Sequence, residues 1–600
     1  MLDSLKNSWK AAVIKAVNKL YGLNETDINM TNPPKSEMGD IAFPLFPFSK
    51  SARKAPQIIA SEVMNEILSS EHPEGEMNTA GAYLNVALNI QSIYLPLLEK
   101  VKKEGSLYGR GEGLNGKKIM LEFSCPNTNK PLHLGHMRND SLGEAVSRIL
   151  KANGAEVMKV NLINNRGVHI CKSMLAYKVF SNGETPSSTG EKGDHFVGRY
   201  YVKFASWQKE TEEKAEKLRN EGHNQEADEI MKNSPEVQAQ AMLRAWEEGD
   251  EETIKLWNLM NGWTLDGLYE SYKNMGISFD RYYYESETYK YGKAEILKGL
   301  EDGVFFRTED GSVQIDLKEI GLDKKVLLRK DGTTIYITQD VGTAIRRHED
   351  WPFDRLIYVV ASEQQYHFKA LFYILKKLGY SWADELYHLS YGMVNLPEGK
   401  MKSREGTVVD ADDLLESLSA LAKEEIISKD RESAVGDVDS VARKIALAAL
   451  NYYLLQVSPT KDMIFDPKKS ISFNGNTGPY LEYMGARISS ILRKAETISG
   501  LKDAEINPSL LASDDEKSLI KLVSQYPAAV KEAGDAYDPS VIAAYLYEVA
   551  KTFSHYYHDN QVADASNIPL SAARLSLVSM ILTVMKNAFV LLGIPFLESM

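Results

Sequence analysis

The chain has only two cysteines, Cys125 and Cys171, among its 600 residues. Two thiols are too few for a disulfide framework or a four-cysteine zinc site, so the sequence argues against a structural metal. Sparse, widely separated cysteines also fit a reducing compartment. We therefore expect a cytoplasmic protein with no metal-ligating residues of its own.

Uninterrupted apolar runs of membrane-spanning length are also missing. The most apolar stretch, residues 577–594, is broken by Lys586 and Asn587, which predicts a packed helix. The first twenty residues are amphipathic and carry four lysines, unlike a secretory signal peptide. We expect no association with a membrane.

Positive charge is in deficit, because the formal net charge is −13 at pH 7. The field of such a chain repels phosphate and argues against indiscriminate binding of nucleic acid, but it does not exclude one specific RNA. Two local basic clusters could contact RNA phosphates or could be solvated helix faces: Lys50, Arg53 and Lys54, and Arg487, Arg493 and Lys494.

The chain is too long for a single hydrophobic core and is predicted to form several domains. Residues 1–105 have the pattern of a small α/β unit, and a glycine-rich stretch at 105–116 marks its end. A Glu- and Lys-rich insertion is expected at about 185–295, and the chain after 410 is almost entirely helical in pattern. Between 106 and 410, short apolar runs alternate with helical patterns, which predicts a doubly wound parallel sheet: 118–124, 156–163, 355–361 and 388–394.

The most informative motif follows the first of these apolar runs. Residues 122–139 read Glu-Phe-Ser-Cys-Pro-Asn-Thr-Asn-Lys-Pro-Leu-His-Leu-Gly-His-Met-Arg-Asn and predict a strand, a loop and the start of a helix. His133 and His136 can lie on one side of that helix start, where free backbone N–H groups favour phosphate. Gly135 would let an adenine ring approach the backbone. Taken alone, the motif could equally be a group of polar residues at a surface turn.

A second segment points to the same chemistry. Residues 399–406 read Gly-Lys-Met-Lys-Ser-Arg-Glu-Gly and form a flexible basic loop between a strand-like and a helix-like pattern. A cationic loop suits a departing pyrophosphate, although by itself it could be a solvated turn. Because parallel strands end at one edge of a sheet, the two segments are expected to meet, and together they favour a nucleotide site.

These motifs resemble those of class I aminoacyl-tRNA synthetases, and nearly the whole chain resembles the arginyl-tRNA synthetases. Three further segments carry the likeness to the arginine family: Tyr336–Asp340, Ser362–Gln364 and Asn476–Arg487. The resemblance implies a Rossmann-type catalytic domain at 106–410 with the insertion at about 185–295. It also implies an additional tRNA-binding domain at 1–105, a helical connector at 411–470 and an α-helical anticodon-binding domain at 471–600.

The activity that the resemblance implies is arginine–tRNA ligation. L-arginine would react with ATP to give arginyl-adenylate and pyrophosphate, and arginine would then pass to the 3′-terminal adenosine of tRNA(Arg). Mg²⁺ would accompany ATP, held mainly by phosphate oxygens. A monomer is the default expectation.

The resemblance also assigns roles around the nucleotide. His133, His136 and Lys400 would stabilise charge on the phosphates, and Gly135, Met401 and Ser403 would complete the ATP site. Ser403 departs from the usual Lys-Met-Ser-Lys-Ser loop, since a second lysine belongs there. Lys130 is predicted to compensate by reaching the same phosphates.

The arginine site is likewise implied by the resemblance. A guanidinium is planar and permanently charged, so its pocket should offer paired acceptors. Tyr336 and Asp340 would bind it, with Glu122 as a second acid, and the α-amino and carboxylate groups would be held by further residues: Asn127, His136 and Gln364. Singly, each of these would be an ordinary packing, capping or turn residue. The segment Asn164–Gly167 departs from the Gly-Asp-Trp-Gly of many relatives, with no consequence evident from the sequence.

Three other functions compete with this one. A synthetase for another amino acid would have no use for paired carboxylates if its substrate were neutral. A small-molecule nucleotidyltransferase would not need the N-terminal and C-terminal domains. A non-catalytic RNA-binding paralogue should have lost His133, His136 or Lys400, and the sequence retains all three.

Overall fold

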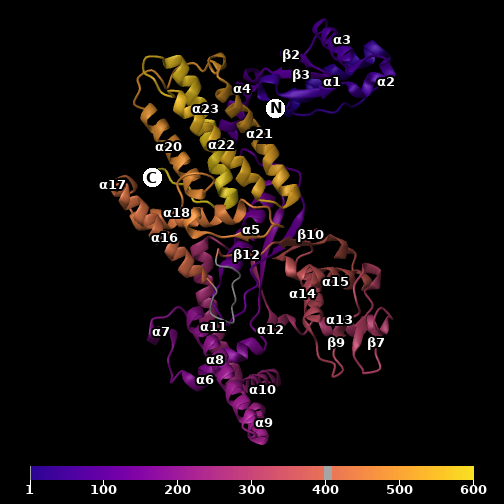
Figure 1. Ribbon diagram of the computed structural model, residues 1–600, viewed down its shortest axis with the longest axis vertical. Coiled ribbons are helices and arrows are strands. Elements are labelled where there is room, and N and C mark those ends of the chain that lie inside the picture. Colours follow the sequence, from indigo (N-terminus) through magenta and orange to yellow (C-terminus); the bar gives the residue numbers. More distant parts are fainter. Residues whose placement is uncertain (1, 398–408) are drawn as a thin grey trace. The chain divides into compact units, whose positions relative to one another are not determined.

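The computed structural model describes residues 2–397 and 409–600, and the chain divides into two compact units (Figure 1). The first unit contains Met1–Gly109, Met484–Ala529 and Tyr545–Asn587. The second contains Arg110–Tyr483, Val530–Ala544 and Ala588–Met600. Each unit is described by itself.

A parallel sheet forms the centre of the second unit. Its strand order is β11-β10-β4-β5-β6, and all four neighbouring pairs are parallel. The bounds of the strands are β4 Lys118–Glu122, β5 Glu156–Ile163, β6 Arg281–Tyr284, β10 Arg355–Ala361 and β11 Leu386–Tyr391. The predicted doubly wound parallel sheet is therefore confirmed, and β5 and β10 have the predicted bounds.

Strand β4 lies in the middle of this sheet, with a parallel neighbour on each of its two edges. The helix α5 (Leu134–Ala152) leads from β4 to β5, while β10 pairs with the opposite edge of β4. In parallel sheets, ligands collect beyond the carboxyl ends of strands at such a reversal of strand order. The loop from β4 to α5, which contains the first motif, lies at this position.

Helix α14 (Tyr336–Asp350) is fixed against α13 (Gly292–Glu301) by an unusually close backbone approach. A Cβ atom added at Gly342 would lie 2.3 Å from the backbone nitrogen of Gly292. No side chain fits there, so glycine is required at the crossing. The apolar face of α14, including Ile337 and Val341, is buried in the same core as Met120 of β4. This packing fixes the helix that carries the predicted arginine-binding residues.

Helices of the insertion share a core with α6 (Val168–Phe180), which precedes the insertion. This core contains residues of α6 and α8 (Gly193–Asn220) together with Met260. Figure 1 shows α6, α8, α9 (Asn224–Lys232) and α10 (Pro235–Glu248) gathered in one helical group. The predicted insertion at about 185–295 nevertheless contains β6, an edge strand of the parallel sheet. A four-residue strand is too short to show a clear period, which is why its membership was not predicted.

A second departure from prediction follows the insertion. Three short strands, β7 (Phe306–Arg307), β8 (Val313–Ile315) and β9 (Lys325–Leu328), form a separate antiparallel sheet. Val313, Ile315 and Leu328 are buried in the core that also contains residues of α14. The small sheet therefore packs with α14.

The first unit combines a small α/β fold with C-terminal helices. An antiparallel sheet, β1-β3-β2, is built from Ile41–Pro44, Tyr83–Leu88 and Gly75–Ala80, and α1 (Leu2–Tyr21) and α3 (Pro56–Leu68) contact each other. The Tyr94 hydroxyl donates to the Ala573 carbonyl at 3.2 Å, and the Tyr108 hydroxyl donates to the Val523 carbonyl at 2.9 Å.

Helix α23 (Ile568–Leu592) is the one helix of the described residues that is long and apolar enough to cross a membrane. However, 72% of its most apolar window is buried within the protein. Its burial and its packing neighbours account for its composition, as predicted for the apolar stretch near the C-terminus.

Candidate active site

The two histidines of the first motif lie at the beginning of α5, and both cap it. His133 is the N-cap, its Nδ1 accepts a hydrogen bond from the Gly135 backbone N–H at 3.1 Å, and the His136 Nδ1 accepts from the His133 N–H at 3.2 Å. The two ring centroids are 3.9 Å apart. Because each Nδ1 is an acceptor, a neutral ring carries its proton on Nε2, which remains a donor.

Burial keeps both rings neutral. Together with the nearby charge of Lys130, it lowers the pKa of His133 to about 4. Burial, followed by the charges of His133 and Lys130, lowers the pKa of His136 well below its ordinary value. Burial also lowers the pKa of the Lys130 ammonium. The site thus presents two neutral imidazole donors beside one amine, at a helix N-terminus that itself favours anions.

Gly135 is less open than the sequence suggested. A Cβ atom at this position would lie 3.0 Å from Cε1 of His133, so the imidazole of His133 already lies over the glycine. The close approach of His133 gives a structural reason for glycine here. An adenine ring would have to approach beside the imidazole.

The loop between β4 and α5 is held in an uncommon backbone conformation. Ser124 and Cys125 have positive φ angles of 73° and 50°. The Ser124 N–H donates to Oδ1 of Asn139 at 2.5 Å, and the Cys125 N–H donates to Oδ1 of Asn161 at 3.1 Å. One asparagine belongs to α5 and the other to β5, so the helix and the neighbouring strand together fix the loop that leads to His133.

The chain that follows the second motif returns to this point. The Leu134 N–H donates to the Val409 carbonyl at 3.1 Å, and the Ala411 N–H donates to the Leu132 carbonyl at 3.0 Å. His133 and Asp410 therefore form an antiparallel bridge. These backbone contacts join the residues that come directly after the second motif to the first motif. The predicted ATP-binding residues Lys400, Met401 and Ser403 themselves lie outside the described residues.

The predicted arginine-binding residues of α14 lie in its first two turns. Tyr336 is 73% exposed, and the Asp340 carboxylate, one turn later, accepts a hydrogen bond from Nε2 of His367 at 2.6 Å. His367 belongs to α15 (Gln365–Lys377), which follows β10. The Asp340 carboxylate is thus oriented by a neighbour while part of it remains accessible.

Glu122 has a different environment from the one predicted. It is buried at the end of β4 and forms an ion pair with Arg347, which is buried in α14. Burial raises the pKa of Glu122, whereas the charge of Arg347 opposes this effect. A carboxylate that already holds an internal guanidinium is not free to serve as a second acid for a ligand. Its structural effect is to join β4 to α14.

Asn127 and Gln364 are both exposed and lie at the same edge of the sheet. Asn127 follows β4, and Gln364 ends the short turn Ser362–Gln364 that follows β10. The two strands are parallel neighbours, with Glu122 opposite Tyr358. Asn127 also bridges Asn164 after β5. Loops that follow three adjacent strands therefore bring polar residues to one edge of the sheet.

A cavity of about 880 Å³ lies at the start of α14. Tyr336 and Gln339 of α14 line it, together with Glu285 and Arg166. Glu285 is buried, and its pKa is raised to about 7 by burial and by the negative charge of Asp340, against the lowering effect of Arg166. A strongly perturbed carboxylate in a polar cavity is typical of a binding site.

Sequence reasoning missed Glu285, Arg166 and His367. Glu285 immediately follows β6, and Arg166 follows β5, so both lie at the carboxyl ends of strands. Because β5 was predicted from the sequence, Arg166 could have been identified as a residue beyond the carboxyl end of a strand. Glu285 could not have been identified in this way, because β6 was not predicted.

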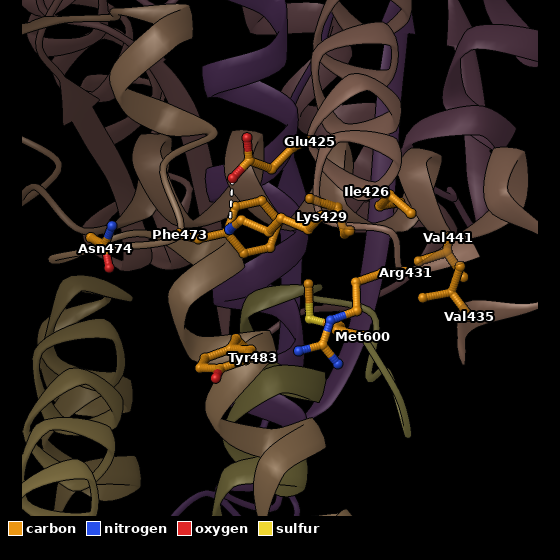
Figure 2. A pocket seen from close by; sticks show the side chains of 11 residues that line it. Glu425, Ile426, Lys429, Arg431, Val435, Val441, Phe473, Asn474, Tyr483 and Met600 are labelled. Carbon is orange, nitrogen blue, oxygen red and sulfur yellow. Dashed lines mark ion pairs between the residues drawn. The ribbon is translucent and has the colours of Figure 1, made fainter. Parts of the chain in front are cut away.

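A second cavity, of about 290 Å³, lies among α16 (Ala411–Ser428), α18 (Val438–Leu455), α20 (Gly478–Ala495) and the last residue of the chain. Figure 2 shows Phe473, Tyr483 and Met600 around it, with Arg431 also at its wall. The dashed line in the figure is the ion pair of Lys429 with Glu425, 2.7 Å long. Lys429 also lies 4.8 Å from the ring centre of Phe473.

Comparison with known protein families gives matches along most of the chain. Residues 98–467 match "tRNA synthetases class I (R), catalytic domain", and residues 481–600 match "DALR anticodon binding domain". Residues 7–88 match "Arginyl tRNA synthetase N terminal domain".

Individual relatives agree with these matches. The chain is 52% identical to an arginine–tRNA ligase of Treponema denticola over the full length of both, and 42% identical to one of Parabacteroides distasonis over 98% of both. The arginyl-tRNA synthetase structure of Thermus thermophilus has a TM-score of 0.74 and 25% identity, covering 99% of this chain and all of that one. The Plasmodium falciparum structure, 19% identical over 98% of both chains, has a TM-score of 0.73 and shows the same fold.

Proposed function

The chain belongs to the class I arginyl-tRNA synthetase family, and from that premise we propose which of its residues carry out each step. The enzyme activates L-arginine with ATP to arginyl-adenylate and pyrophosphate, and then transfers arginine to the 3′-terminal adenosine of its tRNA. Our assignment depends on one observation: the structure has two neutral imidazole donors at the start of α5 and a separate pair of acids, Asp340 and Glu285.

In the activation step, His133 and His136 donate hydrogen bonds from Nε2 to oxygens of the α-phosphate. Negative charge grows on these oxygens as the arginine carboxylate attacks, so preorganised donors stabilise the transition state more than the ground state. The N-terminus of α5 adds a favourable dipole at the same place. His136 also faces the reacting carboxylate of arginine, and Lys400 with Met401 and Ser403 would complete the phosphate site.

In the arginine pocket, Asp340 and Glu285 accept hydrogen bonds from the guanidinium, and the Tyr336 hydroxyl completes the set of acceptors. We assign the second acid to Glu285 rather than Glu122, because Glu122 is buried against Arg347. The exposed amides at the sheet edge, Asn127 and Gln364, hold the α-amino and carboxylate groups. Steady-state kinetics with each substrate varied in turn tests this division: variants of the acids should raise the KM for arginine alone.

Arginine binding should weaken in acid because of Glu285. Its pKa of about 7 means that the carboxylate becomes protonated as the pH falls through 7, and the neutral form attracts a guanidinium less. The expected KM for arginine is constant above about pH 8 and rises by up to about tenfold per pH unit below 7. Glu285→Gln should have a higher KM that no longer changes between pH 6 and 8. A wild-type KM that stays constant over this range would contradict the assignment.

Lys130 is proposed to substitute for the lysine that is absent at position 403. Its charge influences both motif histidines, which supports a role for it at the same phosphates. Lys130→Ala should slow adenylate formation by about 10- to 100-fold and weaken arginine binding much less. Lys151→Ala, at the exposed far end of α5, is the matched control and should behave as wild type. Equal losses in rate and arginine affinity would show that Lys130 does not act on the phosphates.

Magnesium is proposed to arrive with ATP, held by phosphate oxygens. Within residues 2–397 and 409–600, one group of side chains has metal-ligand geometry: Asp194, His195 and Asp412. The Lys192 ammonium lies 2.5 Å from Asp412 and 3.2 Å from Asp194, so a cation of the chain already occupies the position of a metal ion. These residues do not fit Mg²⁺. Mg²⁺ would instead be bound by the phosphate oxygens of ATP, where it would neutralise part of their negative charge.

The wider organisation is proposed as follows. The domains are a tRNA-binding unit at 1–105, the catalytic domain at 106–410, a connector at 411–470 and an anticodon-binding domain at 471–600. We propose a monomer that acts in the cytoplasm without a membrane. Sedimentation of the protein with and without tRNA tests the monomer.

The cavity in Figure 2 is proposed to accept one unstacked base of the tRNA. Tyr483 and Met600 belong to the segment that matches an anticodon-binding domain, and proteins commonly stack single-stranded bases on aromatic rings. Tyr483→Ala should raise the KM for tRNA about tenfold or more, leaving the KM for ATP unchanged. Tyr483→Phe keeps the ring and should change the KM for tRNA much less. Equal effects of the two variants would argue against stacking.

A further inference from the structure

Arg166 occupies an unexpected position at the arginine pocket. Its segment, Asn164–Gly167, is where the sequence departs from the tryptophan-containing pattern of many relatives. The guanidinium carbon lies 4.1 Å from the ring centre of Tyr289, and Nη2 forms an ion pair with Glu247 of α10. Trp246 lies 5.7 Å away on another side. The side chain is only 12% exposed.

These contacts do not satisfy the whole guanidinium. Among the residues that the structure describes, no hydrogen-bond partner is present for the buried Nε atom of Arg166. The insertion helix α10 and the turn after α12 (Glu285–Thr288) hold the group from one side. Its other side belongs to the wall of the 880 Å³ cavity, together with Glu285 and Tyr336.

Arg166 also acts electrostatically on the pocket. Its positive charge lowers the pKa of Glu285 and Tyr336, while the negative charge of Asp340 raises both. Arg166 and Asp340 are the charged groups that act on Glu285, and Tyr336 lines the cavity with it. The cavity is also lined by other charged residues: Arg244, Glu247, Lys290, Lys293, Arg329 and Asp331. A substrate guanidinium beside Glu285 therefore meets the fixed guanidinium of Arg166 in the cavity wall as well as the field of two acids, Glu285 and Asp340.

We propose that Arg166 is a specificity-determining residue whose fixed guanidinium partly neutralises the acidic arginine pocket, so that charge alone does not bind a ligand there. The proposal rests on the arginine pocket assigned above. When the negative field of the acids is reduced, the affinity for an amino-acid side chain depends on directional hydrogen bonds. A planar guanidinium can make these bonds in pairs, whereas the ammonium of lysine cannot. Weakening a competitor in this way is a recognised route to specificity.

The test compares Arg166→Met with Arg244→Met. Both substitutions remove one positive charge from the same cavity wall, but Arg244 is exposed and does not influence Glu285. The measurements are the KM for arginine between pH 6 and 9 and the ratio of kcat/KM for arginine and lysine in ATP-dependent activation with tRNA present. Arg166→Lys, which keeps the charge, reports on packing.

For Arg166→Met we expect a KM for arginine about threefold to tenfold lower above pH 8 and about tenfold greater relative use of lysine. The pH below which the KM rises should move upward, because Arg166 no longer lowers the pKa of Glu285. Arg244→Met should match wild type, and Arg166→Lys should keep the wild-type pH profile.

Two results would overturn the inference. If Arg166→Met raises the KM at every pH without moving the pH at which it rises, Arg166 is only a packing residue. If Arg244→Met reproduces every change, the effect is one of general charge. Asp340→Asn distinguishes failure of the inference from failure of the proposed arginine pocket. If Asp340→Asn leaves the KM for arginine unchanged, the pocket assignment itself is wrong. If Asp340→Asn raises the KM but the Arg166 variants behave as wild type, only the inference about Arg166 is wrong.

Discussion

The variant His136→Ala is expected to form arginyl-adenylate about 10²- to 10³-fold more slowly than the wild type. Its ring is neutral and half-buried, with Nδ1 accepting the His133 N–H, so Nε2 is the donor that alanine removes. Because that donor acts mainly on charge developing in the transition state, kcat should fall while the KM for arginine changes by less than about fivefold. Single-turnover adenylate formation with tRNA present measures this.

A control is needed because His136 also caps α5. Losing the cap should lower the stability of the protein by about 1 kcal/mol, which thermal unfolding would report. His136→Asn offers a side-chain acceptor for the cap and should recover stability more than rate. His223→Ala, at the exposed start of α9, should match wild type in both. A rate loss below about tenfold in His136→Ala would remove this histidine from the phosphate site.

The variant Asp340→Asn is expected to raise the KM for arginine by about 30- to 100-fold with a much smaller change in kcat. Replacing a carboxylate by an amide turns a charge-assisted hydrogen bond to the guanidinium into a neutral one, a loss of about 2 to 3 kcal/mol. The amide oxygen can still contact His367, which lies 2.6 Å from the Asp340 carboxylate, so the local structure should persist. Steady-state activation kinetics give both constants.

Asp331→Asn is the matched control for this change. Asp331 lines the cavity beside Tyr336 and Glu285, is exposed, and accepts a hydrogen bond from the Thr333 N–H at 2.9 Å within its own turn. The KM for arginine should stay within about twofold of wild type, as for most surface substitutions. If Asp331→Asn and Asp340→Asn raise the KM equally, the effect is one of general charge, and Asp340 makes no dedicated contact with the guanidinium.

Much of the fold could be predicted from local pattern. The strands β5 and β10 are continuous apolar runs bounded by turns, and such runs predict buried parallel strands. The motif that contains His133 and His136 could be placed after a strand and at a helix start for the same reason. Its position in the fold then followed from the rule for parallel sheets.

The parts that could not be predicted depend on contacts between distant segments. Glu122 looked like an available acid, but a buried arginine on α14 pairs with it, and nothing in the local sequence shows that partner. Glu285 was missed because β6 is four residues long and shows no clear period. The influence of Arg166 on Glu285 arises only when loops from two strands face one cavity.

The measurement that tests the account most directly is the equilibrium dissociation constant for arginine in wild type, His136→Ala and Asp340→Asn at pH 8, with tRNA and a non-hydrolysable ATP analogue present. The account predicts that His136→Ala binds arginine within about fivefold of wild type, whereas Asp340→Asn binds at least about 30-fold more weakly. Equal loss of affinity in the two variants, or wild-type affinity in Asp340→Asn, would contradict the separation of a phosphate site at α5 from an arginine pocket at α14.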